Sequence, residues 1–234
     1  MKTPTLSSTT QKLLDIAELE MAKVQDSGHD IDHVLRVYNL ALKIAQTEKE
    51  VDLEVLESAV ILHDIGKAKE DQDSSGKVDH AVVGAEMAKE ILEPLGFSFE
   101  KIRHVQDCIL SHRYRNDYKP QTIEAKILHD ADKLETVGAI GLARSFVWVG
   151  RHNAKIYKKV LDINEYAKSN LSDGKINGRI MDKSKHSIHI NYELKDKFLL
   201  EKLYTKKAKK IGKERLKYYE KYLARLDREV LGEI

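Results

Sequence analysis

The sequence has a single cysteine among its 234 residues, Cys108, so no disulfide can form within the chain. That lack indicates a reducing compartment, and we interpret Cys108 as a buried helix residue rather than a catalytic thiol. No segment approaches the roughly 18 apolar residues of a membrane span. The N-terminal stretch "MKTPTLSSTTQK" lacks the apolar core of a secretion signal. These absences predict a cytoplasmic protein with no membrane anchor.

Proline is also scarce, with three residues, and the chain is 41% hydrophobic and 33% charged. This composition is typical of a globular protein rich in helix formers. The net charge of +2 is unevenly distributed, because residues 195–228 hold 13 Lys and Arg against 5 Asp and Glu. Such a basic segment either attracts polyanions or forms a solvated helix face. We favour the solvated face and expect no nucleic-acid partner, because no nucleic-acid motif accompanies the basic residues.

Apolar residues recur at helical spacing along most of the chain. We find no strong strand, internal repeat or linker, and the polar stretch 68–78 is predicted to be a loop. The pattern predicts one all-α domain over 1–234, with a core at about 10–150 and a helical C-terminal extension at about 150–234. The expected helices include a first one along Leu13, Ala17, Met21 and Val24, then about 30–47, 52–64, 79–95, 99–111, 122–137 and 205–230.

Five of these helices carry a titratable residue on the apolar face. A single inward histidine is usually a hydrogen-bonded core residue, but an unpaired buried carboxylate must find a partner or lose its charge. Five such groups are hard to satisfy in pairs, whereas one divalent cation would satisfy several of them. The pattern therefore predicts a metal site if these helices share a core, and a polar core is the alternative. The five residues are His33, His63, His80, His112 and Asp132.

Three basic residues are candidates for contacts with an anionic substrate. Arg36 follows His33 by about one turn and could bind a phosphate through two parallel hydrogen bonds. The alternative role of Arg36 is an ion pair with Asp132 or Glu135. Lys67 could neutralise phosphate charge, although a solvated lysine is nearly as good an interpretation. Arg144 is a further candidate anion contact.

Two acidic residues are expected to support the site rather than to bind its contents. Asp30 precedes His33 by one turn, where it could orient the imidazole or cap the helix N-terminus. Glu135 lies one turn beyond Asp132. Five other histidines align with no apolar stripe and are interpreted as surface or packing residues: His104, His129, His152, His186 and His189.

Three strings carry a resemblance to a known family: "GHDIDHVLRV" at 28–37, "ILHDIGK" at 61–67 and "LHDADKLETVGAIGLAR" at 128–144. In order and spacing they resemble the HD-domain superfamily of metal-dependent phosphohydrolases, in particular its bacterial nucleotide pyrophosphohydrolase-like subgroup. The C-terminal string "LLEKLYTKKAKKIGKERLKYYEKYL" extends the resemblance to about residues 10–230. The resemblance implies a helical bundle of the HD type that cleaves phosphate esters or anhydrides.

The resemblance also implies roles for individual residues. Asp64, or alternatively Asp132, would orient the attacking water and Lys67 would stabilise phosphate charge, so Asp64 and Lys67 are the catalytic candidates. His80 and His112 would contact substrate phosphates, and a second metal bridged by Asp64, or a core role, are the alternatives. The absence of the "GYP" string of cyclic-dinucleotide phosphodiesterases weakens the two-metal alternative. The implied metal ligands are His33, His63, Asp64 and Asp132, with Mn²⁺ as first choice and Mg²⁺, Co²⁺, Ni²⁺ or Fe²⁺ as alternatives.

The function implied by the resemblance is hydrolysis of nucleoside and deoxynucleoside triphosphates to a monophosphate and pyrophosphate. Alternative enzymatic functions are a 5′-nucleotidase and an alarmone or cyclic-nucleotide phosphodiesterase. A non-catalytic, metal-bound nucleotide sensor is the alternative of a different class. The expected partners are a nucleotide and, as an open alternative to a monomer, a second copy of the chain.

Overall fold

The computed structural model describes residues 6–24, 28–113, 118–176 and 178–234. It divides into two compact units, Met1–Asp132 and Lys133–Ile234. Within the described ranges there is no strand, only isolated bridges between Lys155 and Ser187 and between Leu171 and Ile180. The predicted all-α class is therefore confirmed, whereas the single domain with a core to about residue 150 stays a prediction.

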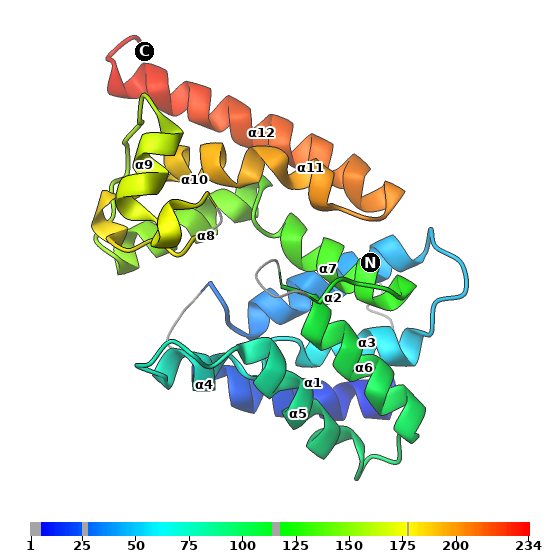
Figure 1. Ribbon diagram of the computed structural model, residues 1–234. Coiled ribbons are helices and arrows are strands. Elements are labelled where there is room, and N and C mark those ends of the chain that lie inside the picture. Colours follow the sequence, from blue (N-terminus) through cyan, green and yellow to red (C-terminus); the bar gives the residue numbers. More distant parts are fainter. Residues whose placement is uncertain (1–5, 25–27, 114–117, 177) are drawn as a thin grey trace. The chain divides into compact units, whose positions relative to one another are not determined.

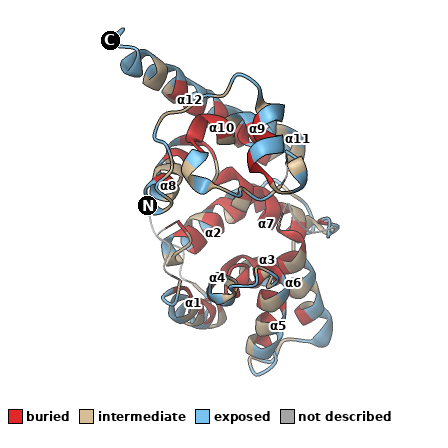
Figure 2. Cartoon of the chain, turned by 60° about the vertical axis from the view of Figure 1, so that its left-hand side comes forward, coloured by how far each residue is buried: buried red, intermediate tan, exposed pale blue. Residues whose placement is uncertain are grey.

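The first unit is a helical bundle in which α5 and α6 run side by side (Figure 1). Residues 58–66, the second half of α3 and the turn after it, are all buried, as the red colouring in Figure 2 shows. The bundle thus surrounds the segment that contains His63 and Asp64. Its helices are α1 (Ser8–Met21), α2 (Ile31–Ala45), α3 (Leu53–Leu62), α4 (Lys67–Gln72), α5 (His80–Leu92), α6 (Phe99–Ser111) and most of α7 (Ile123–Leu134).

Short polar side chains begin the helices that carry the candidate site. Asp30 accepts a hydrogen bond from the His33 backbone N–H at 3.0 Å, and Asp79 accepts one from Ala81 N–H at 2.9 Å. Asp52 and Ser98 cap α3 and α6 in the same way. Each cap satisfies one of the N–H groups that a helix start leaves without an intrahelical partner. The predicted starts of these helices are confirmed to within about one residue.

The prediction of a loop over residues 68–78 is wrong in its first half, because Lys67–Gln72 forms the short helix α4. Ala68 is the only residue of α4 classed as buried, so the helix has no apolar stripe for periodicity to detect. An ion pair between Lys67 and Asp71, four residues apart, supports it. A loop follows, in which Asp73 accepts backbone N–H bonds from Ser75 and from residues 77 and 78.

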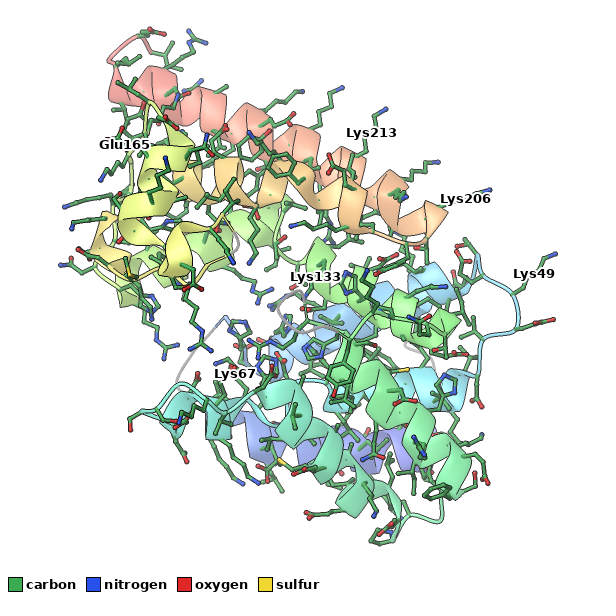
Figure 3. The ribbon with its side chains drawn as sticks, viewed as in Figure 1. Lys49, Lys67, Lys133, Glu165, Lys206 and Lys213 are labelled. Atoms are coloured by element: carbon green, nitrogen blue, oxygen red, sulfur yellow. The ribbon has the colours of Figure 1, made fainter. Side chains whose placement is uncertain are left out.

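The second unit contains the long basic helix α12, and its helices are again separated by turn-rich segments. In Figure 3 the labelled side chains of Lys206 and Lys213 point away from α12, and both residues are exposed. None of the described helices has the length and apolar character needed to cross a membrane. The helices are the end of α7, α8 (Gly138–Arg151), α9 (Ile163–Asn170), α10 (Ile188–Leu194), α11 (Leu199–Lys202) and α12 (Lys206–Val230), with short 3₁₀ turns at Ser172–Gly174, Lys183–Lys185 and Asp196–Phe198.

A buried carboxyl group gives the second unit a pH-dependent stability. Asp196 is 2% exposed and accepts a hydrogen bond from Asn191 Nδ2 at 2.8 Å. Burial raises the pKa of Asp196 to about 6, although Lys195 nearby opposes the rise. Because this pKa lies above the unfolded value near 3.9, the folded state holds the proton more tightly. The contribution of Asp196 to the free energy of unfolding is present at acidic pH and is lost as the pH rises from about 4 through 6.

We therefore expect Asp196→Asn to be more stable than the native protein at pH 7.5, by up to about 3 kcal/mol, but not at pH 4. An asparagine still offers an oxygen to Asn191 and carries no charge. Urea denaturation of both proteins at the two pH values measures the difference. A difference that is the same at both pH values would contradict the assignment.

Candidate metal centre

Of the six residues predicted for the metal-binding region, the structure brings five together around the sixth, Asp64. Asp64 Oδ2 lies 3.6 Å from His33 Nε2 and 3.5 Å from His63 Nε2. His33 Nε2 also lies 3.6 Å from Asp132 Oδ1. These four residues come from α2, the end of α3 and α7, so three separate helices converge on one side of Asp64.

The other oxygen of Asp64 faces the remaining two histidines. Asp64 Oδ1 lies 3.2 Å from His80 Nε2 and 3.7 Å from His112 Nε2. The two Nε2 atoms are themselves 3.2 Å apart. The Asp64 carboxylate thus belongs to two groups of potential metal ligands, each with its donor atoms within 4.8 Å of one another: His33, His63 and Asp64, and Asp64, His80 and His112.

His63 and His112 occupy equivalent positions, directly after the last residues of α3 and α6. His63 Nδ1 lies 2.7 Å from the Val60 carbonyl, and His112 Nδ1 lies 2.6 Å from the Ile109 carbonyl. Since a carbonyl oxygen can only accept, each Nδ1 must carry the proton. Each imidazole therefore satisfies a helix-end carbonyl and presents an Nε2 lone pair to the centre.

The centre is deeply buried, and burial sets the charges of its groups. Asp64 is 4% exposed, and His33 and His63 are fully buried. Burial alone would raise the pKa of Asp64, but the surrounding histidines, His63 and His112 foremost, outweigh it and hold that pKa well below its usual range. Burial lowers the pKa of His112 to about 4. An ionised carboxylate and a neutral imidazole are the forms that bind metal ions.

The arrangement of lone pairs fits a divalent cation. His63 Nε2 is buried and has no hydrogen-bond partner, and the nearby Asp64 carboxylate is itself an acceptor. His112 Nε2, deprotonated for the reason given above, likewise faces acceptor atoms. Buried acceptors that face one another are costly unless a positive charge lies between them. Imidazole nitrogens and carboxylate oxygens suit Mn²⁺, Fe²⁺, Co²⁺, Ni²⁺ and Zn²⁺.

Three residues predicted to support the site or bind substrate lie in the first unit, and each has different surroundings. Asp30 contacts the His33 backbone as the cap of α2. Arg36 is half-buried on α2, one turn after His33. Lys67 (labelled in Figure 3) is paired with Asp71 and lies 3.6 Å from Glu70.

Two predicted residues, Glu135 and Arg144, belong to the second unit. Glu135 Oε1 lies 3.8 Å from a guanidinium nitrogen of Arg215, so Glu135 forms an ion pair within that unit. Arg144 is half-buried on α8. The expectation that these residues act at the site stays a prediction.

Two residues beside the centre escaped the sequence prediction, Glu70 and Arg113. Glu70 Oε2 lies 2.8 Å from His80 Nδ1, and its Oε1 accepts a hydrogen bond from Arg113 at 2.8 Å. Glu70 lies in the segment that was expected to be a loop. The one feature of the sequence that could point to Arg113 is its position directly after His112, a predicted site residue.

A sequence profile of the HD domain family matches residues 30–137. Over 137 residues the chain is 32% identical to the uncharacterized protein YpgQ of Bacillus subtilis, covering 57% of this chain and 63% of YpgQ. Over 179 residues it is 28% identical to the 3′-5′ exoribonuclease YhaM of Bacillus pumilus, covering 67% of this chain and 57% of YhaM. The chain thus spans less than two thirds of either relative. Over 131 residues it is 35% identical to the uncharacterized protein MJ0778 of Methanocaldococcus jannaschii, covering 50% of this chain and 72% of MJ0778.

Solved structures with similar folds cover nearly the whole chain. An HD superfamily hydrolase from an uncultured Thermotogales bacterium is 27% identical, with a TM-score of 0.62 and coverage of 94% of this chain and 91% of that one. YpgQ of Bacillus subtilis in complex with ADP has a TM-score of 0.66 and covers 94% of this chain and 97% of its own. At 21% identity, the YpgQ structure supports the fold alone.

Proposed function

The chain belongs to the HD domain family, and from this premise we propose that it is a metal-dependent nucleotide phosphohydrolase. The reaction we propose is hydrolysis of a nucleoside or deoxynucleoside triphosphate to the monophosphate and pyrophosphate. The observation that carries the proposal is the buried Asp64 carboxylate, whose two oxygens face imidazole Nε2 atoms on both sides. Such a cluster of acceptors requires cations, and phosphate-rich substrates bind where cations are held.

Two ligand groups follow from the distances around Asp64. His33, His63 and Asp132 would hold one ion together with Asp64 Oδ2, and His80 and His112 would hold a second with Asp64 Oδ1. We expect Mn²⁺ first. A bound divalent ion would supply Lewis-acid polarisation of a phosphoryl oxygen and a water of lowered pKa. The sequence had favoured substrate contacts for the last two histidines, and the short distance to Asp64 Oδ1 now favours the second ion.

The chain's own residues would bind and orient the phosphates. Asp64 lies between the two ligand groups, where its carboxylate could accept a hydrogen bond from the attacking water. Arg36, one turn from His33, could hold a phosphate through a bidentate contact. Lys67 would have to leave Asp71 to neutralise the departing phosphate group. Arg144 remains a candidate anion contact.

The relatives support a nucleotide substrate in general terms. YpgQ was crystallised with ADP, a nucleoside diphosphate, and YhaM is a 3′-5′ exoribonuclease. ADP and the RNA on which an exoribonuclease acts both contain a nucleoside joined to phosphate. We place the free triphosphate ahead of RNA because the motif strings resemble those of the pyrophosphohydrolase subgroup.

Product analysis tests the proposal. The protein would be incubated with Mn²⁺ and each common nucleoside and deoxynucleoside triphosphate, and the products separated by ion-exchange chromatography. We expect monophosphate and pyrophosphate, with one ¹⁸O from labelled water in one of the two products. Release of orthophosphate from monophosphates, or shortening of a single-stranded RNA, would overturn the pyrophosphohydrolase. Bound metal with every nucleotide intact would replace it with the sensor.

A further inference from the structure

A small ionic network covers the outer side of His80. Glu70 on α4 contacts His80 Nδ1 at 2.8 Å through Oε2. Arg113, directly after α6, donates through one guanidinium nitrogen to Glu70 Oε1 and to Asp79 Oδ1, both at 2.8 Å. Asp79 is the cap of α5, the helix that begins with His80. One guanidinium group therefore links α4, α5 and the end of α6.

The contact with Glu70 determines which nitrogen of His80 carries the proton. A carboxylate held ionised by a guanidinium group can only accept, so His80 Nδ1 donates. In the neutral ring the Nε2 atom then has a free lone pair. That lone pair faces Asp64 Oδ1 at 3.2 Å and His112 Nε2 at 3.2 Å. The latter is also an acceptor, because the proton of His112 lies on Nδ1.

His80 Nε2, His112 Nε2 and Asp64 Oδ1 thus converge as three acceptors when both rings are neutral. Burying them together is costly unless a positive charge lies between them. If His80 carried its proton on Nε2 instead, it could simply donate to Asp64, and the site would need no ion. By holding the proton on Nδ1, Glu70 disfavours this neutral tautomer, in which His80 Nε2 would satisfy Asp64 without an ion. The network itself is not a third cation site, because the Arg113 guanidinium already lies between the carboxylates of Glu70 and Asp79.

We propose that Glu70, held in place by Arg113, is a positioning residue that fixes His80 with its proton on Nδ1 and thereby presents Nε2 to a second divalent ion beside Asp64 Oδ1. The inference rests on the proposed metal-dependent function, which it extends to a residue outside the ligand set. A carboxylate behind a metal-bound histidine orients the ring and raises its basicity, and its removal lowers metal affinity about 10- to 100-fold.

Metal titration without any substrate tests this role. Calorimetric titration of the full chain with Mn²⁺ should give two ions for the native protein. In Glu70→Ala the second ion should bind about 10- to 100-fold more weakly, and the first should change less than about threefold. Glu70→Gln, whose amide oxygen still accepts from Nδ1, should restore part of the affinity. Glu86→Ala is the matched control, since it removes an exposed glutamate from α5.

A second readout follows the proton itself. In the metal-free protein at a pH where the ring is neutral, ¹⁵N chemical shifts of the His80 ring, assigned with His80→Asn, should report a protonated Nδ1 in the native chain and a shift of the proton toward Nε2 in Glu70→Ala. Equal binding in native and Glu70→Ala protein, equal weakening of both ions, or a single ion in the native protein would each overturn the proposal. Two ions that respond as expected, in a protein that hydrolyses no nucleotide, would overturn only the proposed function. If Glu70→Ala fails to fold, Arg113→Lys, which loosens the hold on Glu70, provides the comparison.

Discussion

Asp64→Asn is expected to remove both metal ions and to lower phosphohydrolase activity at least about 1,000-fold, which corresponds to roughly 4 kcal/mol of transition-state stabilisation. Asp64 is the one residue whose oxygens face both ligand groups, Oδ2 toward His33 and His63 and Oδ1 toward the other two histidines. An amide keeps the shape of the side chain but replaces one oxygen by a hydrogen-bond donor. It also removes the negative charge that offsets the charge of the cations.

The metal content of purified, Mn²⁺-equilibrated protein distinguishes this role from general damage. We expect Asp64→Asn to retain the helical circular dichroism of the native chain while binding no ion stoichiometrically. Asp132→Ala, which removes the carboxylate whose Oδ1 lies 3.6 Å from His33 Nε2, should lose one ion and keep the other. Asp32→Asn, an exposed carboxylate beside His33, should change neither ion. Retention of both ions in Asp64→Asn would contradict the assignment of the centre.

Helical periodicity reports which side chains face the core, so the sequence alone predicts a shared core position for five residues, although not for Asp64: His33, His63, His80, His112 and Asp132. His33 and His80 are the third and first residues of their helices, and Asp30 is recognisable in the sequence as a candidate cap before the first of them. Periodicity does not report which inward groups share a partner. It therefore left open whether His80 and His112 contact the substrate or a second ion.

What the sequence could not supply are contacts between elements that follow no periodic pattern. Glu70 and Arg113 are separated by 43 residues, and the pair forms only because α4 and the end of α6 both lie beside the start of α5. The sequence predicts a loop where α4 forms, because a one-and-a-half-turn polar helix buries too little apolar surface to leave an apolar stripe. A partner of Glu135 is more distant still in sequence, 80 residues away at Arg215.

The glycine in "HDIGK" is expected to be as sensitive to substitution as the metal ligands, for a steric reason. A Cβ atom at Gly66 would lie 2.3 Å from the His80 carbonyl oxygen and 2.8 Å from Gly84 N, and both are backbone atoms of α5. The φ angle of Gly66 is −77°, which alanine adopts without strain. The substitution therefore acts through this contact alone, and α5 must move by about 1 Å or more to relieve it.

Because α5 begins with His80, a shift of this helix would also separate His80 Nε2 from Asp64 Oδ1, which are 3.2 Å apart. We expect Gly66→Ala to lower the free energy of unfolding by about 3 kcal/mol and to weaken the second ion more than the first. Urea denaturation and Mn²⁺ titration measure the two effects.

Gly84→Ala is the matched control, because it adds the same methyl group on the opposite side of the same helix contact. A Cβ at Gly84 would have its nearest neighbours at 3.6 Å, which is ordinary van der Waals contact. Since alanine favours an interior helix position over glycine by about 1 kcal/mol, this variant should be as stable as the native protein or more stable. Opposite signs for the two substitutions would show that α5 is held against Gly66 by a contact too close for any side chain. Equal effects would mean that the approach of His80 to Asp64 does not depend on that glycine.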